Sequence, residues 1–171
     1  MGFVTAAHRG PSFFTIGTIF RANNPSGPVL GSIRNANDIA INRDAAFVTL
    51  DSQAQVNNFL PSGTLGAFFA TPIQGAAVMN LSYTQPNGMN FGWIRNPSDN
   101  VNINGASVNI VTVDFARPIM QGDSGGLIYI ESSGNVHPVA GIIVARLTAN
   151  HHIGFYVRAD LILSSLGLTL H

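Results

Sequence analysis

Short β-type runs alternate with turn residues along most of this chain, and that alternation most limits what it can fold into. The runs, such as "AAFVTL", "VNIVTV" and "PVAGIIVARL", are rich in valine, isoleucine, threonine and aromatic residues. They are separated by turn sequences such as "NNPSGP", "LPSG", "TQPNG" and "ESSGN". Because the runs recur at nearly regular intervals, the pattern favours an all-β domain built as antiparallel barrels or a sandwich.

One segment near the end, Arg158 to Gly167, has helical character instead. Leu161, Leu163 and Leu166 are expected to share a face, and Asp160 favours the first turn of a helix. The glycine that ends the segment is a natural stop signal. The sequence therefore predicts an all-β domain closed by one C-terminal α-helix.

The amino-acid composition argues against several classes of function. Eight basic and eight acidic residues among 171 give a formal net charge of zero, which argues against nucleic acid or an anionic membrane as a partner. No apolar run reaches the roughly 18 residues of a membrane-spanning helix. The chain has no cysteine, so disulfides and thiolate metal sites are excluded.

The run "QGDSGG" places one serine, Ser124, among three glycines just before an apolar strand. A serine hydroxyl becomes an effective nucleophile when a histidine takes its proton and a buried carboxylate orients that histidine. His8 follows an apolar strand through two alanines, and Asp44 stands at the start of another strand before two alanines. These residues are candidates for such a set, whereas an ordinary glycine-rich turn is the plainer reading of the run.

The segments "GFVTAAH", "DAAFVTL" and "GDSGG", in that order, resemble the chymotrypsin-fold serine proteases. More narrowly they resemble the bacterial branch of α-lytic protease and the streptogrisins, as does the ending "LILSSLGLTL". The resemblance covers nearly the whole chain. It implies two packed antiparallel six-stranded-type β-barrels, the first incomplete, with a C-terminal α-helix. Residues 1–62 would form the half that carries His8 and Asp44, and residues 63–171 the half that carries Ser124.

The same resemblance implies a role for each candidate residue. Ser124 would be the nucleophile, His8 the general base and then acid, and Asp44 the orienting carboxylate. The backbone N–H groups of Gly122 and Ser124 would form the oxyanion hole. The substrate would be a polypeptide, with no cofactor and no metal ion. The edge of Val144 to Arg146 would pair with the substrate backbone as an added strand.

Further residues are expected to contact the substrate, either through this edge or as walls of the pocket for the side chain before the scissile bond. They are Met120, Gln121, Val144, Ala145, Arg146, Gly154 and Tyr156.

Some assignments stay open. Asp38 in "NDIAI" is a rival for the orienting carboxylate. Surface or turn positions are expected for His137, His151, His152 and His171, although His151 or His152 could border the side-chain pocket. Trp93 and the phenylalanines are expected in the core.

Three departures from the family pattern stand out. The strands that normally precede the histidine strand are absent, which predicts an exposed edge near Met1 where a missing N-terminal segment or another chain would pair. Asn80 stands where the family buries an arginine against the aspartate of the serine motif, Asp123, so this aspartate would rely on hydrogen bonds. Arg146 falls where the family has glycine beside the pocket, and would narrow the pocket or attract an acidic residue.

The leading hypothesis is a serine endopeptidase that works through an acyl-enzyme intermediate. An extracellular location follows from the resemblance, although the opening "MGFVTAAH" is not a secretory signal. The alternative is a catalytically impaired protease-like binding or assembly module, motivated by the missing N-terminal strands. A general esterase is a further possibility, because the same triad hydrolyses esters.

Overall fold

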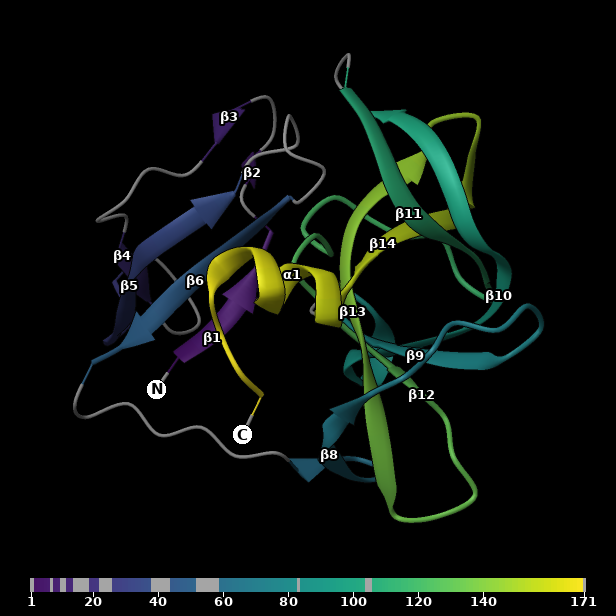
Figure 1. Ribbon diagram of the computed structural model, residues 1–171, viewed down its shortest axis with the longest axis horizontal. Helices are drawn as coiled ribbons and strands as arrows, with labels where there is room; N and C mark the ends of the chain where they lie inside the picture. Colours follow the sequence, from purple (N-terminus) through teal and green to yellow (C-terminus); the bar gives the residue numbers. More distant parts are fainter. Residues whose placement is uncertain are drawn as a thin grey trace.

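Two β-sheets lie side by side in the computed structural model, with a single α-helix in front of the gap between them (Figure 1). The residues that the structure describes are 2–6, 8–9, 12–13, 19–21, 26–37, 44–51, 59–82, 84–103 and 106–170. At eight residues the described α-helix is too short to cross a membrane. The expected all-β architecture with a C-terminal helix is confirmed.

The first sheet has four described strands in the order β1-β6-β5-β4, all antiparallel. These strands are β1 (Gly2–Thr5), β4 (Ile19–Arg21), β5 (Val29–Asn37) and β6 (Ala45–Leu50). A separate short pair is formed by β2 (His8–Arg9) and β3 (Ser12–Phe13). Within the described residues the core of this sheet is small: it is one cluster of Ile33, Ala46 and Val48, with Phe3 packed against them.

The second sheet has eight described strands in the order β12-β9-β10-β11-β14-β13-β8-β7. They are β7 (Phe59–Leu60), β8 (Gly63–Phe69), β9 (Ala77–Leu81), β10 (Met89–Ile103), β11 (Ala106–Phe115), β12 (Leu127–Ile130), β13 (Val136–Leu147) and β14 (Asn150–Arg158). A short 3₁₀ turn, η2 (Pro86–Gly88), precedes β10. Strand β12 also pairs with β13, so six of these strands follow one another in a ring of hydrogen-bonded neighbours.

One pairing departs from the antiparallel prediction: β8 runs parallel to β13. The two strands are far apart along the chain, so no hairpin fixes their relative direction. Strand β10 is long, because it continues through Pro97 with shifts of register against β11. Such irregularities allow a strand to pass a proline.

The second sheet encloses two clusters of buried apolar side chains. One of them includes Ala45 from β6 together with Ile142 and Val144 from β13, and Val4 and Phe47 pack against it. The start of β6 and the end of β1 therefore take part in the core of the second sheet. This packing joins the two sheets at the point where the candidate residues lie.

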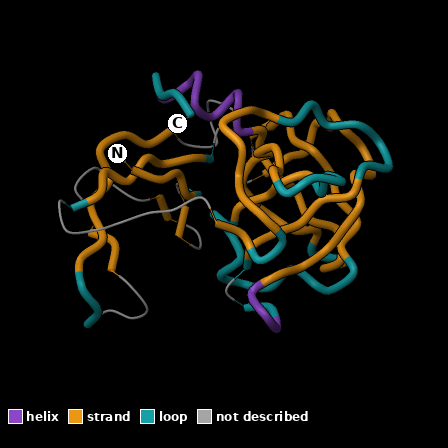
Figure 2. Tube along the Cα trace, turned by 90° about the horizontal axis from the view of Figure 1, so that it is seen from below, coloured by secondary structure: helices purple, strands orange, loops and turns teal. Residues whose placement is uncertain are grey.

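The helix α1 (Ala159–Leu166) ends at Gly167, whose φ of 67° is the left-handed conformation that suits glycine. Its buried residues are Ala159, Ile162 and Leu166. The prediction that Leu161, Leu163 and Leu166 share one face is therefore wrong. Residues three and four apart share a helix face, whereas residues two apart point in different directions. The helix packs on β13 and β14 and also contacts β5, above both sheets in Figure 2.

Several aromatic residues expected in the core are exposed. The exposed fraction of the side chain is 48% for Trp93 and 72% for Phe59, whereas Phe115 and Phe155 are buried. Trp93 lies between buried Gly92 and Ile94 on one strand, and alternate residues of a strand face opposite sides of the sheet. Its ring packs edge-on against the ring of Phe91, with 4.4 Å between the centroids.

Candidate active site

The turn that carries Ser124 is fixed to the middle of β13. The backbone N–H of Gly125 donates to the Ile143 carbonyl at 2.8 Å, and the N–H of Ile143 donates to the Gly126 carbonyl at 2.9 Å. Ser124 itself is half-buried. The serine therefore lies beside the strand whose continuation is expected to receive the substrate backbone.

Two glycines of this turn adopt backbone angles that other residues rarely take. Gly122 has φ +102° and Gly125 has φ +86°, both in the left-handed region. Within the described part of the chain, the N–H groups of Gly122 and Ser124 donate to no acceptor. Two free N–H groups on either side of Asp123 are what an oxyanion hole requires.

Asp123 is buried under the turn and is held by hydrogen bonds from uncharged groups. Its carboxylate accepts from the hydroxyls of Ser82 and Thr84 and, at 2.8 Å, from the backbone N–H of Met120. No cationic side chain among the described residues forms an ion pair with it. These three hydrogen bonds fix the backbone conformation on both sides of Gly122.

Asn80 is fully buried beside this turn but does not bond to the Asp123 carboxylate. Its side-chain nitrogen donates to the carbonyls of Leu81 at 3.3 Å and Leu127 at 3.2 Å, and its side-chain oxygen has no partner among the described residues. Reasoning from sequence missed Ser82 and Thr84 as the partners of Asp123. Only their position near the end of β9 could have indicated them.

The residues just before His8 pack against the turn from the first sheet. A Cβ atom on Gly125 would overlap the Thr5 hydroxyl and would lie 3.0 Å from the backbone nitrogen of Ala6. Only glycine therefore allows this close approach between the turn and the end of β1. His8 follows in β2, and its side chain lies outside the described residues.

Asp44 is fully buried directly before β6. The next residue, Ala45, is part of the apolar cluster of the second sheet, so Asp44 lies at the junction of the two sheets. The rival carboxylate, Asp38, lies outside the described residues. The set of Ser124, His8 and Asp44 stays a prediction.

The end of β13 offers an unpaired edge. Strand β12 pairs with β13 only as far as Ile142, and the turn takes the backbone bonds of Ile143. Beyond that residue, no described strand pairs with β13 on the side opposite β14. The side chain of Val144 is buried in the core, so this residue can meet a ligand only through its backbone.

Three other predicted substrate residues gather around Ile119, five positions before Ser124. The Arg146 guanidinium donates to the Ile119 carbonyl. Gly154, the neighbour of Arg146 across the strands, packs directly against Ile119, because a Cβ atom there would lie 3.1 Å from its side chain. Tyr156 shares an apolar cluster with Ile119.

Burial raises the pKa of the Tyr156 phenol far above its ordinary value, and its hydroxyl has no hydrogen-bond partner among the described residues. On the loop that follows Ile119, Met120 and Gln121 are exposed.

His137 is buried, which corrects the expectation of a surface histidine. Its Nδ1 accepts from the backbone N–H of Ser132 at 3.3 Å, and its Nε2 lies 3.2 Å from the carbonyl oxygen of Ser62. The ring also packs beside the ring of Tyr129. These contacts tie the turn before β8 to the start of β13, away from the Ser124 turn, and explain why a histidine is buried here.

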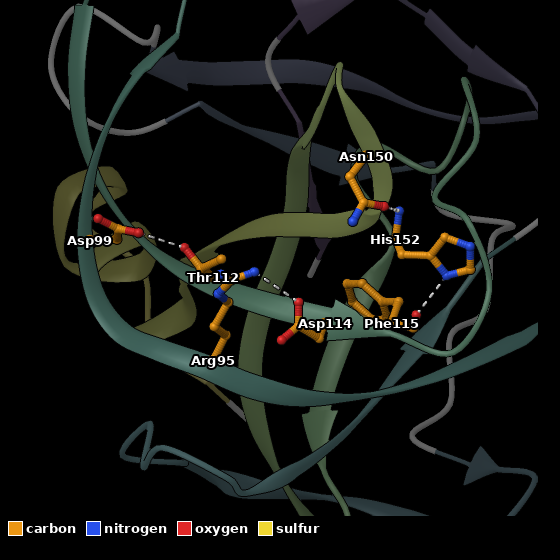
Figure 3. A network of polar contacts seen from close by, with 7 residues as sticks. All are labelled: Arg95, Asp99, Thr112, Asp114, Phe115, Asn150 and His152. Carbon is orange, nitrogen blue, oxygen red and sulfur yellow. Dashed lines mark hydrogen bonds and ion pairs between the residues drawn. The ribbon is translucent and has the colours of Figure 1, made fainter.

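His151 and His152 are exposed, as expected. The Nδ1 atom of His152 lies 3.0 Å from the carbonyl oxygen of Phe115, at the end of β11 (Figure 3). The exposed Arg95–Asp114 pair and the Asp99–Thr112 hydrogen bond lie further along the same strands. In the ranges that the structure describes, no group of histidines and carboxylates could hold a metal ion.

Comparison by sequence finds no matching family model and no matching curated protein. Comparison of structures finds bacterial serine proteases. A Nocardiopsis protease has a TM-score of 0.75 and 23% identity, and the match covers 99% of this chain and 85% of that one. The chymotrypsin of Cellulomonas bogoriensis has a TM-score of 0.73 and 21% identity over the same shares.

A third match, described as a glutamic acid specific serine protease that uses a histidine triad in substrate binding, has a TM-score of 0.74 and 20% identity. It covers 99% of this chain and 86% of that chain. The chain thus has the fold of the bacterial chymotrypsin-like serine proteases.

Proposed function

We propose that this protein is a serine endopeptidase. The observation that carries the proposal is the turn around Ser124. The N–H groups of Gly122 and Ser124 have no acceptor among the described residues, Gly125 and Gly126 are hydrogen-bonded to β13, and Gly125 packs against the residues that lead to His8. The likeness to serine proteases in fold supports the same reading.

In the proposed reaction, the Ser124 hydroxyl attacks the carbonyl carbon of the scissile peptide bond while His8 takes the hydroxyl proton. The oxyanion that forms is stabilised by the N–H groups of Gly122 and Ser124, each contributing about 3–4 kcal/mol. His8 then gives its proton to the leaving amine, so that the bond to nitrogen breaks and an acyl-enzyme remains. Water hydrolyses the ester by the same route.

The histidine must be neutral to accept a proton, so the rate is expected to rise with pH through the ordinary titration range of histidine. Asp44, buried at the junction of the sheets, would orient the ring of His8. The substrate backbone would add to the unpaired edge of β13 beyond Ile143, which places the scissile bond next to Ser124.

The test is hydrolysis of casein and of a mixed fluorogenic peptide library by the purified chain and by Ser124→Ala. We expect the substitution to lower kcat by about 10⁴-fold or more. Ser132→Ala is the matched control, because Ser132 also lies within hydrogen-bonding distance of a histidine, His137, at 3.2 Å. Equal hydrolysis by the parent and Ser124→Ala, or loss of hydrolysis in Ser132→Ala alone, would remove the proposal.

The second candidate is a binding or assembly module without turnover. It is favoured by the small core of the first sheet, since the described residues give that sheet one apolar cluster of three buried residues, while the second sheet has two larger clusters. A weakly held first sheet would leave His8 poorly positioned. This candidate predicts no hydrolysis by the parent chain, together with equal binding of peptides by the parent and Ser124→Ala.

A further inference from the structure

We propose that Arg146 makes this site selective for peptides with a carboxylate side chain at the residue whose carbonyl is attacked. The inference rests on the proposed peptidase function and names the class of substrate that the site takes. It is carried by the position of the guanidinium, by its lack of an acidic partner, and by the backbone edge beside it.

The position of Arg146 follows from two backbone anchors. Ile143 is hydrogen-bonded to Gly125 and Gly126, the two residues that follow Ser124, and Arg146 is three residues further along the same strand. At about 3.3 Å per residue, its Cα atom lies about 10 Å along β13 from that anchor. The side chain then bonds to the Ile119 carbonyl on the loop that leads to Ser124. The guanidinium is therefore held against the loop that leads to the candidate nucleophile.

The charge of Arg146 has no counterion in the described part of the chain. Two other described arginines do form ion pairs with carboxylates. Arg95 lies 3.4 Å from Asp114, and Arg158 lies 2.6 Å from Asp160. Arg146 instead bonds one neutral carbonyl. A guanidinium has five N–H donors, so most of its donors remain available for a ligand.

Asp123, the carboxylate of the serine turn, cannot supply that counterion. Asp123 is buried and already accepts from two hydroxyls and one backbone N–H. Arg146 is itself half-buried, which strengthens its interaction with an opposite charge relative to an arginine in open water. A planar guanidinium matches a carboxylate in a two-pronged hydrogen-bonded pair. A ligand carboxylate would complete this site.

Gly154 explains how Arg146 reaches the loop. Because Gly154 has no side chain, Phe115 and Ile119 pack directly on β14 opposite Arg146. That packing brings the Ile119 carbonyl within reach of the guanidinium. The same bond fixes the orientation of the guanidinium, so a substrate does not have to order a free side chain on binding.

The experiment compares tetrapeptide coumarin amides that differ only in the residue before the scissile bond, which is glutamate, aspartate, glutamine, leucine or arginine. We expect kcat/KM for glutamate to exceed that for glutamine by about tenfold or more, as for a hydrogen bond to a charged group. Arg146→Gln should abolish the difference, and Arg146→Lys should keep only part of it. Arg117→Gln is the matched control, since Arg117 is an exposed arginine two residues before Ile119.

Binding supplies a second readout that needs no turnover. Peptides that end in glutamate amide or glutamine amide are titrated into Ser124→Ala and into the double variant with Arg146→Gln. Tighter binding of the glutamate peptide that disappears in the double variant supports the inference. Equal binding of both peptides, or a preference that survives Arg146→Gln, overturns it. Absence of hydrolysis with every peptide overturns the proposed function, while the binding result still decides the role of Arg146.

Discussion

The two sheets of this molecule differ in how much of their structure they hold by themselves. The second sheet has eight described strands, two buried apolar clusters and a serine turn bonded to β13 and to Asp123. The first sheet has four described strands and, among its described residues, one separate apolar cluster of three buried residues. The difference indicates that the second sheet is the scaffold and that the first sheet depends on it.

The dependence is visible at the junction. Val4, Ala45 and Phe47 of the first sheet belong to or pack on an apolar cluster of the second. Helix α1 contacts strands of both sheets (Figure 2). Changes at this junction should therefore reduce activity more than stability, and changes inside the second sheet should do the reverse.

The largest effect is expected at the carboxylate that the first sheet contributes. Asp44→Asn should lower kcat by about 10⁴-fold, because an amide no longer holds the catalytic histidine in the required tautomer. Asp38→Asn is the matched change at the rival position and should leave kcat within a few fold. The measurement is hydrolysis of one good peptide substrate by both variants. The reverse ranking would make Asp38 the orienting carboxylate.

A smaller effect is expected where the turn meets β1. Gly125→Ala places a side chain at φ +86° and against Thr5, so the end of β1 must move and His8 with it. A displacement of about 1 Å can cost about 10²-fold in rate, and the left-handed conformation adds about 1–2 kcal/mol of destabilisation.

Gly134→Ala is the control for this change, because nothing lies within 4 Å of a Cβ atom there. Steady-state kinetics and urea unfolding of both variants give the comparison. Unchanged kinetics in Gly125→Ala would show that the junction does not position the catalytic residues.

The smallest effect on activity is expected inside the second sheet, at His137. His137→Leu removes the hydrogen bonds to the N–H of half-buried Ser132 and to the carbonyl of exposed Ser62, and each such bond is worth about 0.5–1.5 kcal/mol. The free energy of unfolding should therefore fall, while kcat/KM of the folded protein stays the same. Exposed His151→Leu should change stability by no more than about 0.5 kcal/mol. A large loss of kcat/KM in His137→Leu would contradict the division between scaffold and junction.

Local sequence patterns predicted the parts of the fold that depend on neighbouring residues. The alternating runs indicated the strands, and Gly167 marked the end of the helix, where its φ of 67° requires glycine. The glycines around Ser124 indicated an unusual turn, which the backbone angles of Gly122 and Gly125 bear out.

Contacts between distant segments were not predictable in this way. The parallel pairing of β8 with β13, the burial of His137 and the hydroxyl partners of Asp123 all join residues far apart in the chain. Trp93 was misassigned because hydrophobicity alone does not say which face of a strand is covered. Each of these features depends on tertiary packing that a single sequence does not encode locally.

The most direct test of the proposed site is covalent labelling by an organofluorophosphate, with peptide mapping by mass spectrometry. We expect one adduct per chain, located on Ser124. Labelling should be slower by about 10³-fold or more in His8→Ala, because the serine then lacks its base. If the parent protein forms no adduct on Ser124, Ser124 is not the nucleophile. If labelling is equally fast with and without His8, His8 is not its base.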